Sequence, residues 1–141
     1  MNPSSSSQRG PLIIEGLDHV ALVVRDLRGS IAWYERVLGL ERKHQDAWGD
    51  VPALLVTPGG GQSGVALFPL SGDAPESLPE RWYALVVDHV AFRVDRKNFE
   101  AAQKRLRELD IEFNFEDHTI SHSIYFEDLD RHRLEITTYE I

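Results

Sequence analysis

The chain consists of two halves with the same order of apolar and polar patterns, and each half predicts one strand, one helix and three further strands. In the first half, residues 17–24 alternate as a strand does, and Ile31, Tyr34 and Leu38 then recur at helical spacing. Gly39 follows them, as expected at a helix C-terminus. The expected elements are a strand at 17–24, a helix capped by Asp26 or Ser30, and strands at about 40–48, 53–57 and 63–70.

The second half repeats this order. Phe99, Ala102, Leu106 and Leu109 recur at helical spacing, and Asp95 stands where an N-terminal cap is expected. The expected elements are a strand at 84–94, a helix at 96–109, and strands at 111–115, 123–126 and 133–139, the last two joined by a turn at 128–131. This order predicts an α+β fold in which two paired βαβββ modules form a curved mixed sheet cup with the helices on its outer face.

Length and composition favour a single domain behind a flexible tail. The chain has 141 residues, of which 42% are hydrophobic, and this is enough for one core. Residues 1–10 are rich in serine and lack an apolar segment, so they are expected to be a flexible tail. Residues 11–141 are expected to form one domain, with module one at about 16–70, a linker at about 71–82 and module two at about 83–141.

Charge and composition exclude several classes of function. The net charge is −8 and the basic residues are dispersed, which disfavours nucleic-acid binding. No apolar run reaches the length needed to span a membrane. The chain has no cysteine, which excludes disulfides and thiolate chemistry and favours a cytoplasmic location. We therefore expect a cytoplasmic protein that acts on a small molecule and binds neither nucleic acid nor membrane.

Both halves begin with the phrase Asp-His-Val-Ala, which places His19 and His89 at equivalent positions. Strand alternation directs these histidines, and Glu135 of the last strand, to the face opposite the helices. The preceding Asp18 and Asp88 are expected to point the other way, as strand-start or turn residues. A single histidine in an apolar strand is most often a hydrogen-bonded core residue, but three such groups on one face favour a shared site.

Two neutral imidazoles and one carboxylate are a ligand set for a divalent metal ion. The predicted ligands are His19, His89 and Glu135. Fe(II) is favoured because two histidines and one carboxylate form its facial triad, and Mn, Zn, Ni or Co also fit. Three protein ligands leave positions open for substrate. A substrate with two adjacent oxygens could therefore chelate the ion and be polarised by it.

The chain resembles the vicinal oxygen chelate superfamily, which includes glyoxalase I, extradiol dioxygenases, fosfomycin-resistance enzymes and bleomycin-binding proteins. The resemblance covers about residues 17–139 and rests on the two Asp-His-Val-Ala phrases, on 33–40 and on 123–135. It implies that the three residues named above are the metal ligands and that the protein is a homodimer. Four-ligand glyoxalases take one more ligand from the fourth strand, where residues 65–68 offer none, so the resemblance favours the three-ligand branches.

Among these branches, the stretch before Glu135 is similar to that of extradiol dioxygenases, in which a histidine and a tyrosine precede the glutamate. His118 and Tyr125 stand at compatible spacings. The resemblance implies that these two act as acid–base or hydrogen-bonding groups in ring cleavage of a catechol-like compound with Fe(II), which is the favoured activity. The usual Pro and Gly of the next turn are Leu129 and Arg131 here, so a non-glycine residue is expected at positive φ.

Other functions stay open at this point. A glyoxalase-like lyase or isomerase shares the metal chemistry, and a fosfomycin-type thiol transferase could use Arg93 and Arg133 to hold a phosphonate. A third alternative is a metal-free drug-binding protein of the bleomycin-resistance type, for which Trp48, Trp82 and Tyr83 could bind a cation through their rings. Metal content separates the enzymes from the binding protein.

Overall fold

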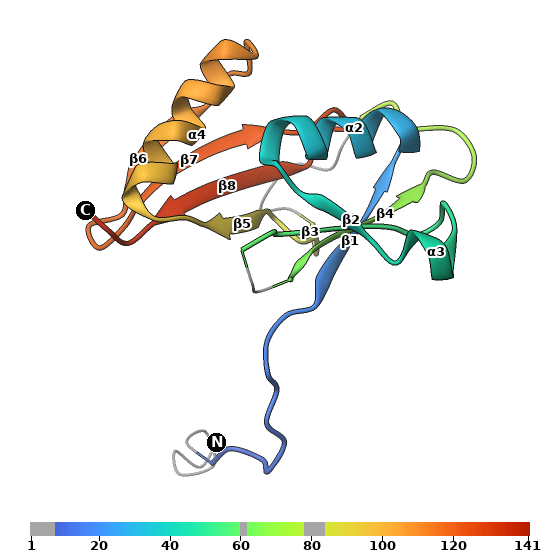
Figure 1. Cartoon of the computed structure of the whole chain (residues 1–141), viewed down its shortest axis with the longest axis horizontal. Coiled ribbons are helices and arrows are strands. Elements are labelled where there is room, and N and C mark those ends of the chain that lie inside the picture. Colours follow the sequence, from blue (N-terminus) through green and yellow to red (C-terminus); the bar gives the residue numbers. More distant parts are fainter. Residues whose placement is uncertain (1–7, 60–61, 78–83) are drawn as a thin grey trace.

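The computed structural model describes residues 8–59, 62–77 and 84–141, which form two mixed sheets of four strands with a long helix against each (Figure 1). Module one contains β1 (His19–Val24), α2 (Leu27–Leu38), β2 (Glu41–Lys43), α3 (Gln45–Trp48), β3 (Ala53–Val56) and β4 (Gly64–Pro69). Module two contains β5 (Val90–Arg93), α4 (Arg96–Glu108), β6 (Asn114–Asp117), β7 (His122–Glu127) and β8 (Arg133–Thr138).

The two sheets have the same topology. The strand orders are β1-β4-β3-β2 and β5-β8-β7-β6, so the first strand of each module lies beside the last. The β1–β4 and β5–β8 pairs are parallel, and the other pairs are antiparallel. The predicted fold class of two βαβββ modules is therefore confirmed, and the two sheets do not close into one barrel.

The ends of both long helices follow from local sequence. Asp26 caps α2 by accepting from the backbone N–H of Gly29 at 3.1 Å, and Gly39 ends the helix at φ 65°. Glycine adopts this left-handed conformation without the steric cost of a Cβ. In α4, Asp95 accepts from the backbone N–H of Asn98 at 2.8 Å. Both caps satisfy N–H groups that have no partner within the helix.

Three expected strands differ from the structure. Instead of one strand at 40–48, β2 is short and α3 follows it, because His44 adopts φ 61° and turns the chain out of the sheet. The strand expected at 84–94 begins only at Val90, and the strand expected at 111–115 begins at Asn114. In the last two cases the apolar pattern extends beyond the residues that have a hydrogen-bonded neighbour strand.

The two modules share one hydrophobic core. Strand residues Leu22, Val24, Leu134 and Ile136 face the helices, which confirms the expected alternation. Trp33 of α2 packs near Phe126 of module two, with their ring centroids 6.5 Å apart. The helix of module one therefore contacts a strand of module two.

A few expectations fall outside the described residues. These are the greater part of the N-terminal tail, the turn at 60–61, and Trp82 and Tyr83 of the cation-binding alternative. Within the described ranges, no helix is both long enough and apolar enough to cross a bilayer.

Candidate metal centre

The helix-free face of the second sheet carries the candidate site. Glu135 of β8 lies opposite Ala91 of β5 and Tyr125 of β7, so these side chains share one face. Ser123 and Thr137 form the next pair on the same face. Glu135 is buried, with 7% of its surface exposed. Strand pairing therefore places a buried carboxylate among polar groups, on the side away from α4.

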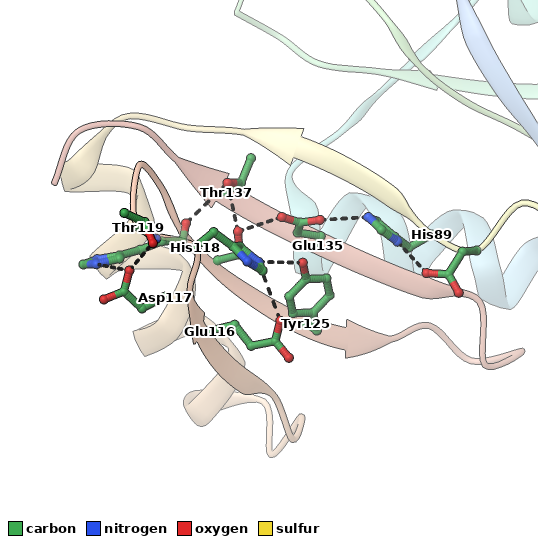
Figure 2. A network of polar contacts seen from close by, with 11 residues as sticks. His89, Glu116, Asp117, His118, Thr119, Tyr125, Glu135 and Thr137 are labelled. Carbon is green, nitrogen blue, oxygen red and sulfur yellow. Dashed lines mark hydrogen bonds and ion pairs between the residues drawn. The ribbon is translucent and has the colours of Figure 1, made fainter. Parts of the chain in front are cut away.

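His89 and Glu135 are in direct contact. His89 Nε2 lies 2.9 Å from Glu135 Oε1 (Figure 2). The Ser123 hydroxyl donates to Glu135 Oε2 at 2.6 Å. Ser123 thereby orients the carboxylate and leaves its other oxygen toward the imidazole. The sequence did not single out Ser123, although alternation places it on the face of Glu135.

This pair fits a divalent metal ion. Two donors at about 2.1 Å from one ion, and at right angles to each other, lie about 3 Å apart. The 2.9 Å between His89 Nε2 and Glu135 Oε1 matches that separation. Both donors are of the type that Fe, Mn and Zn accept. The two side chains can therefore bind one ion between the two atoms that are now in direct contact.

Each histidine of the repeated phrase is hydrogen-bonded to the aspartate that precedes it in the sequence. His19 Nδ1 lies 2.8 Å from Asp18 Oδ2, and His89 Nδ1 lies 2.7 Å from Asp88 Oδ2. The expectation that these aspartates point away was wrong. Asp18 precedes the first residue of β1, and Asp88 lies two residues before β5, so strand alternation does not govern their side chains.

Tyr125 lies opposite Glu135 in the sheet, and His118 contacts Tyr125. The distance from His118 Nε2 to the Tyr125 hydroxyl is 3.0 Å, so the two residues that the resemblance to extradiol dioxygenases singled out are in contact (Figure 2). Burial, followed by the charge of Glu135, raises the pKa of Tyr125. The phenol therefore keeps its proton at neutral pH. His118 also lies 3.6 Å from a carboxylate oxygen of Glu116.

Two arginines stand on the same face. The Arg133 guanidinium carbon lies 4.6 Å from the centre of the Tyr125 ring, and that of Arg93 lies 4.5 Å from the Tyr139 ring. Neither arginine forms an ion pair with a carboxylate in the described part of the chain. Arg133 Nε is buried there without a hydrogen-bond partner. This face therefore presents positive charge next to a carboxylate and a phenol.

His19 lies apart from this cluster, on the sheet of module one. No group of three or more His, Cys, Asp or Glu side chains that could hold a metal ion forms among the described residues. Within its own sheet, the register places Ala66 opposite Ala21, where module two has Glu135 opposite Ala91. Module one thus supplies one imidazole without a neighbouring carboxylate on its last strand.

The two helix-free faces differ in polarity. In module one this face carries the small cluster of Leu54, Val56 and Ala66, with Phe68 packed against it. In module two it carries Glu135 and the hydroxyl and cationic groups described above. The repeated fold therefore produces one apolar wall and one polar wall.

Fold and site together define a class of protein: small domains of paired βαβββ modules with a histidine at the start of the first strand of each module and a carboxylate on the last strand of module two. The chain belongs to the Glyoxalase/Bleomycin resistance protein/Dioxygenase superfamily, whose family model matches residues 16–136.

Among characterised relatives, the chain is similar to the fosfomycin resistance protein FosX of Listeria innocua serovar 6a, with 27% identity over 127 residues, 88% of this chain and 90% of that protein. The structure of FosX from Mesorhizobium loti is 28% identical, with TM-score 0.62, covering 89% of this chain and 93% of that one. A glyoxalase/dioxygenase from Nostoc punctiforme is 24% identical, with TM-score 0.76, covering 96% and 98%, and this likeness concerns the fold.

Proposed function

We propose that this protein is a divalent-metal-dependent enzyme that acts on a small molecule through adjacent oxygen atoms. The proposed ligands are His19, His89 and Glu135. The observation that supports the site most directly is the 2.9 Å between His89 Nε2 and Glu135 Oε1, at the separation expected for two ligands of one ion.

We infer that a second copy of the chain supplies His19. Its imidazole is 41% exposed, and it does not join His89 and Glu135 in one group. A two-fold symmetric homodimer places module one of each chain against module two of the other and so forms two identical sites. The apolar wall of one chain then faces the polar wall of its partner, and the substrate binds between them.

The side chains around the site have separable roles in this proposal. A bound divalent ion supplies Lewis-acid polarisation of a substrate oxygen. Tyr125, whose raised pKa keeps it protonated, donates a hydrogen bond to a developing negative charge. His118 lies within reach of the Tyr125 hydroxyl and exchanges a proton with it. Ser123 holds Glu135 in its orientation.

Our first candidate for the substrate is a small molecule with an acidic group, of the fosfomycin type. Arg93 and Arg133 lie on the face of the site without a carboxylate partner in the described ranges, and guanidinium groups bind acidic oxygens through charge-assisted hydrogen bonds. The similarity to FosX proteins over most of the chain points to the same class. Metal-assisted addition of water or a thiol is the corresponding reaction.

The second candidate is extradiol ring cleavage of a catechol with Fe(II) and dioxygen. The contact between His118 and Tyr125 favours it, because the resemblance to extradiol dioxygenases assigns these two residues acid–base or hydrogen-bonding roles. A metal-free drug-binding role is the remaining alternative, and it requires no metal at His89 and Glu135.

The experiment begins with elemental analysis of protein purified without chelator. The Mn(II) form is then incubated with fosfomycin, with and without a thiol, and followed by phosphorus NMR. The Fe(II) form is tested with catechols in an oxygen electrode. A Glu135→Gln variant is the matched control for both assays. Conversion of fosfomycin supports the first candidate, and oxygen uptake supports the second. Failure to bind any divalent metal would overturn the proposal.

A further inference from the structure

We propose that Asp18 and Asp88 are positioning residues for the metal, because each fixes the proton of its histidine on Nδ1 and so leaves Nε2 to bind the ion. This inference rests on the proposed function, since it assigns a role toward the same metal centre. It adds two carboxylates that do not touch the ion. A ligating histidine commonly donates its other N–H to a carboxylate, which sets the ring orientation and strengthens the ligand.

The same contact occurs at both positions of the repeat. The distances are 2.8 Å for His19 with Asp18 and 2.7 Å for His89 with Asp88, and in both cases the bonded nitrogen is Nδ1. The surroundings differ, because Asp18 has 85% of its side chain exposed and Asp88 only 22%. A contact that recurs in two such different environments is set by the local sequence, not by the packing around it.

The position of each aspartate explains how neighbours in sequence can bond. His19 is the first residue of β1, and His89 immediately precedes β5. Within a pleated strand, neighbouring side chains point to opposite faces. Each aspartate lies outside the strand, so this constraint does not apply to it. Its carboxylate can turn back to the imidazole of the next residue. Each ring is thereby held with Nε2 directed away from its aspartate.

For His89, this ring orientation directs Nε2 toward Glu135. With Nδ1 on Asp88, its Nε2 lies 2.9 Å from Glu135 Oε1, where the ion is proposed to bind. His19 presents its Nε2 in the same way, but without a carboxylate beside it in its own sheet. The nitrogen that each aspartate leaves free is therefore the one that the metal centre needs.

The first test measures Mn(II) affinity of the full chain by electron paramagnetic resonance, which does not depend on turnover. We expect Asp88→Ala to weaken binding roughly 10- to 100-fold, the range for such supporting carboxylates. Asp88→Asn, whose amide oxygen still accepts from Nδ1, is expected to lose less. Asp110→Asn removes the same charge from an exposed turn and is the matched control. Circular dichroism checks that each variant is folded.

The second test determines which imidazole nitrogen of His19 carries the proton. In ¹⁵N-labelled, metal-free protein at about pH 9, where imidazoles are neutral, two-bond ¹H–¹⁵N spectra report which nitrogen carries the proton. We expect His19 in the Nδ1–H form in the native chain and a shift toward the Nε2–H form in Asp18→Ala. The Asp110→Asn control is expected to leave the spectrum of His19 unchanged.

The outcomes separate the two proposals. If the native chain does not bind Mn(II) or any other divalent ion, the proposed function is wrong, whereas the NMR experiment still judges the role of Asp18. If Asp88→Ala and Asp88→Asn both bind Mn(II) as tightly as the native chain does, the positioning role is wrong and the metal site stands. An Nε2–H form of His19 in the native chain also overturns the positioning role.

Discussion

The Tyr34 hydroxyl donates to Asp128 Oδ2 across 2.6 Å and so joins α2 of module one to the turn between β7 and β8 of module two. Both residues are buried. Asp128 Oδ1 also accepts from the backbone N–H groups of Asp130 and His132. Because this turn leads into β8, the contact fixes the strand that carries Glu135. Burial, then the Asp128 charge, raises the pKa of Tyr34 far above its ordinary range.

Replacing Tyr34 by phenylalanine tests this link between the modules. Tyr34→Phe leaves a buried carboxylate without one of its donors, which costs about 1 to 3 kcal/mol of unfolding free energy. Urea unfolding followed by circular dichroism measures the change. Tyr139→Phe, at a 51% exposed position, is the control and is expected to change stability little. Equal stability of Tyr34→Phe and the native chain would contradict the prediction.

The pairing of His132 with Asp128 predicts a stability that depends on pH. Hydrogen bonding to Asp128 raises the pKa of His132 above its ordinary 6.5, so the protonated histidine stabilises the fold. Burial acts to raise the pKa of Asp128, but hydrogen bonds from His132 and Tyr34 lower it overall below 3.8. The histidine contribution is complete below 6.5 and is lost as pH rises through its folded value. The aspartate contribution is complete above 3.8 and is lost as pH falls through its folded value.

The stability advantage of the native chain over His132→Gln is therefore expected to be largest between about pH 4 and 6.5. Unfolding free energies of both proteins at pH 5 and pH 8.5 measure it. The difference should shrink at the higher pH. A difference that stays constant or grows with pH would show that the imidazole is neutral in the folded state.

Arg131 occupies a backbone conformation that favours glycine. Its φ is 67°, which confirms the expectation of a non-glycine residue at positive φ in this turn. Its guanidinium Nε lies 3.3 Å from an exposed Glu127 carboxylate, a surface pair of small value. Arg131→Gly is expected to raise unfolding free energy by up to about 1 kcal/mol relative to Arg131→Ala, which keeps the strain. Thermal unfolding of the two variants tests this, and a less stable glycine variant would contradict it.

Mixing two inactive variants tests whether the site lies between chains. His19→Ala and Glu135→Ala each remove one proposed ligand from every site. Unfolding and refolding them together forms mixed dimers, each with one intact and one doubly altered site, so about one quarter of the native metal content is expected to return.

Metal analysis after dialysis measures this recovery. The double variant His19→Ala/Glu135→Ala, refolded alone, is the control and should bind no metal. If the ligands came from a single chain, the mixture would bind as little as the separate variants.

Tyr125→Phe separates metal binding from chemistry. The ring stays under the Arg133 guanidinium, whereas the hydroxyl that contacts His118 is lost. Mn(II) affinity is expected to stay within about twofold, because the phenol is not a proposed ligand, and turnover to fall roughly 100-fold. Ser121→Ala, directly before β7 and without a proposed role, is the control. A loss of affinity equal to the loss of turnover would place Tyr125 among the groups that hold the metal.

Much of the fold could be predicted because it depends on local patterns. Apolar spacing and the residues at the helix ends identified both long helices, with Asp26 and Asp95 as their caps. Strand alternation placed Glu135 on the helix-free face, and the family resemblance singled out His118 and Tyr125, which are in contact. The end of β2 could not be predicted because it depends on the backbone conformation of His44, and the start of β5 could not be predicted because it depends on where β8 pairs with it.

The sequence by itself determined the two βαβββ modules and which way Glu135 and Tyr125 face, because strand alternation and helical spacing act over a few residues. Only the tertiary structure decided that Asp18 and Asp88 turn back to their histidines, and that His89 meets Glu135 while His19 lies on the other sheet. These placements depend on where each strand begins and on how the modules pack through Tyr34 and Asp128, contacts between residues far apart in the chain.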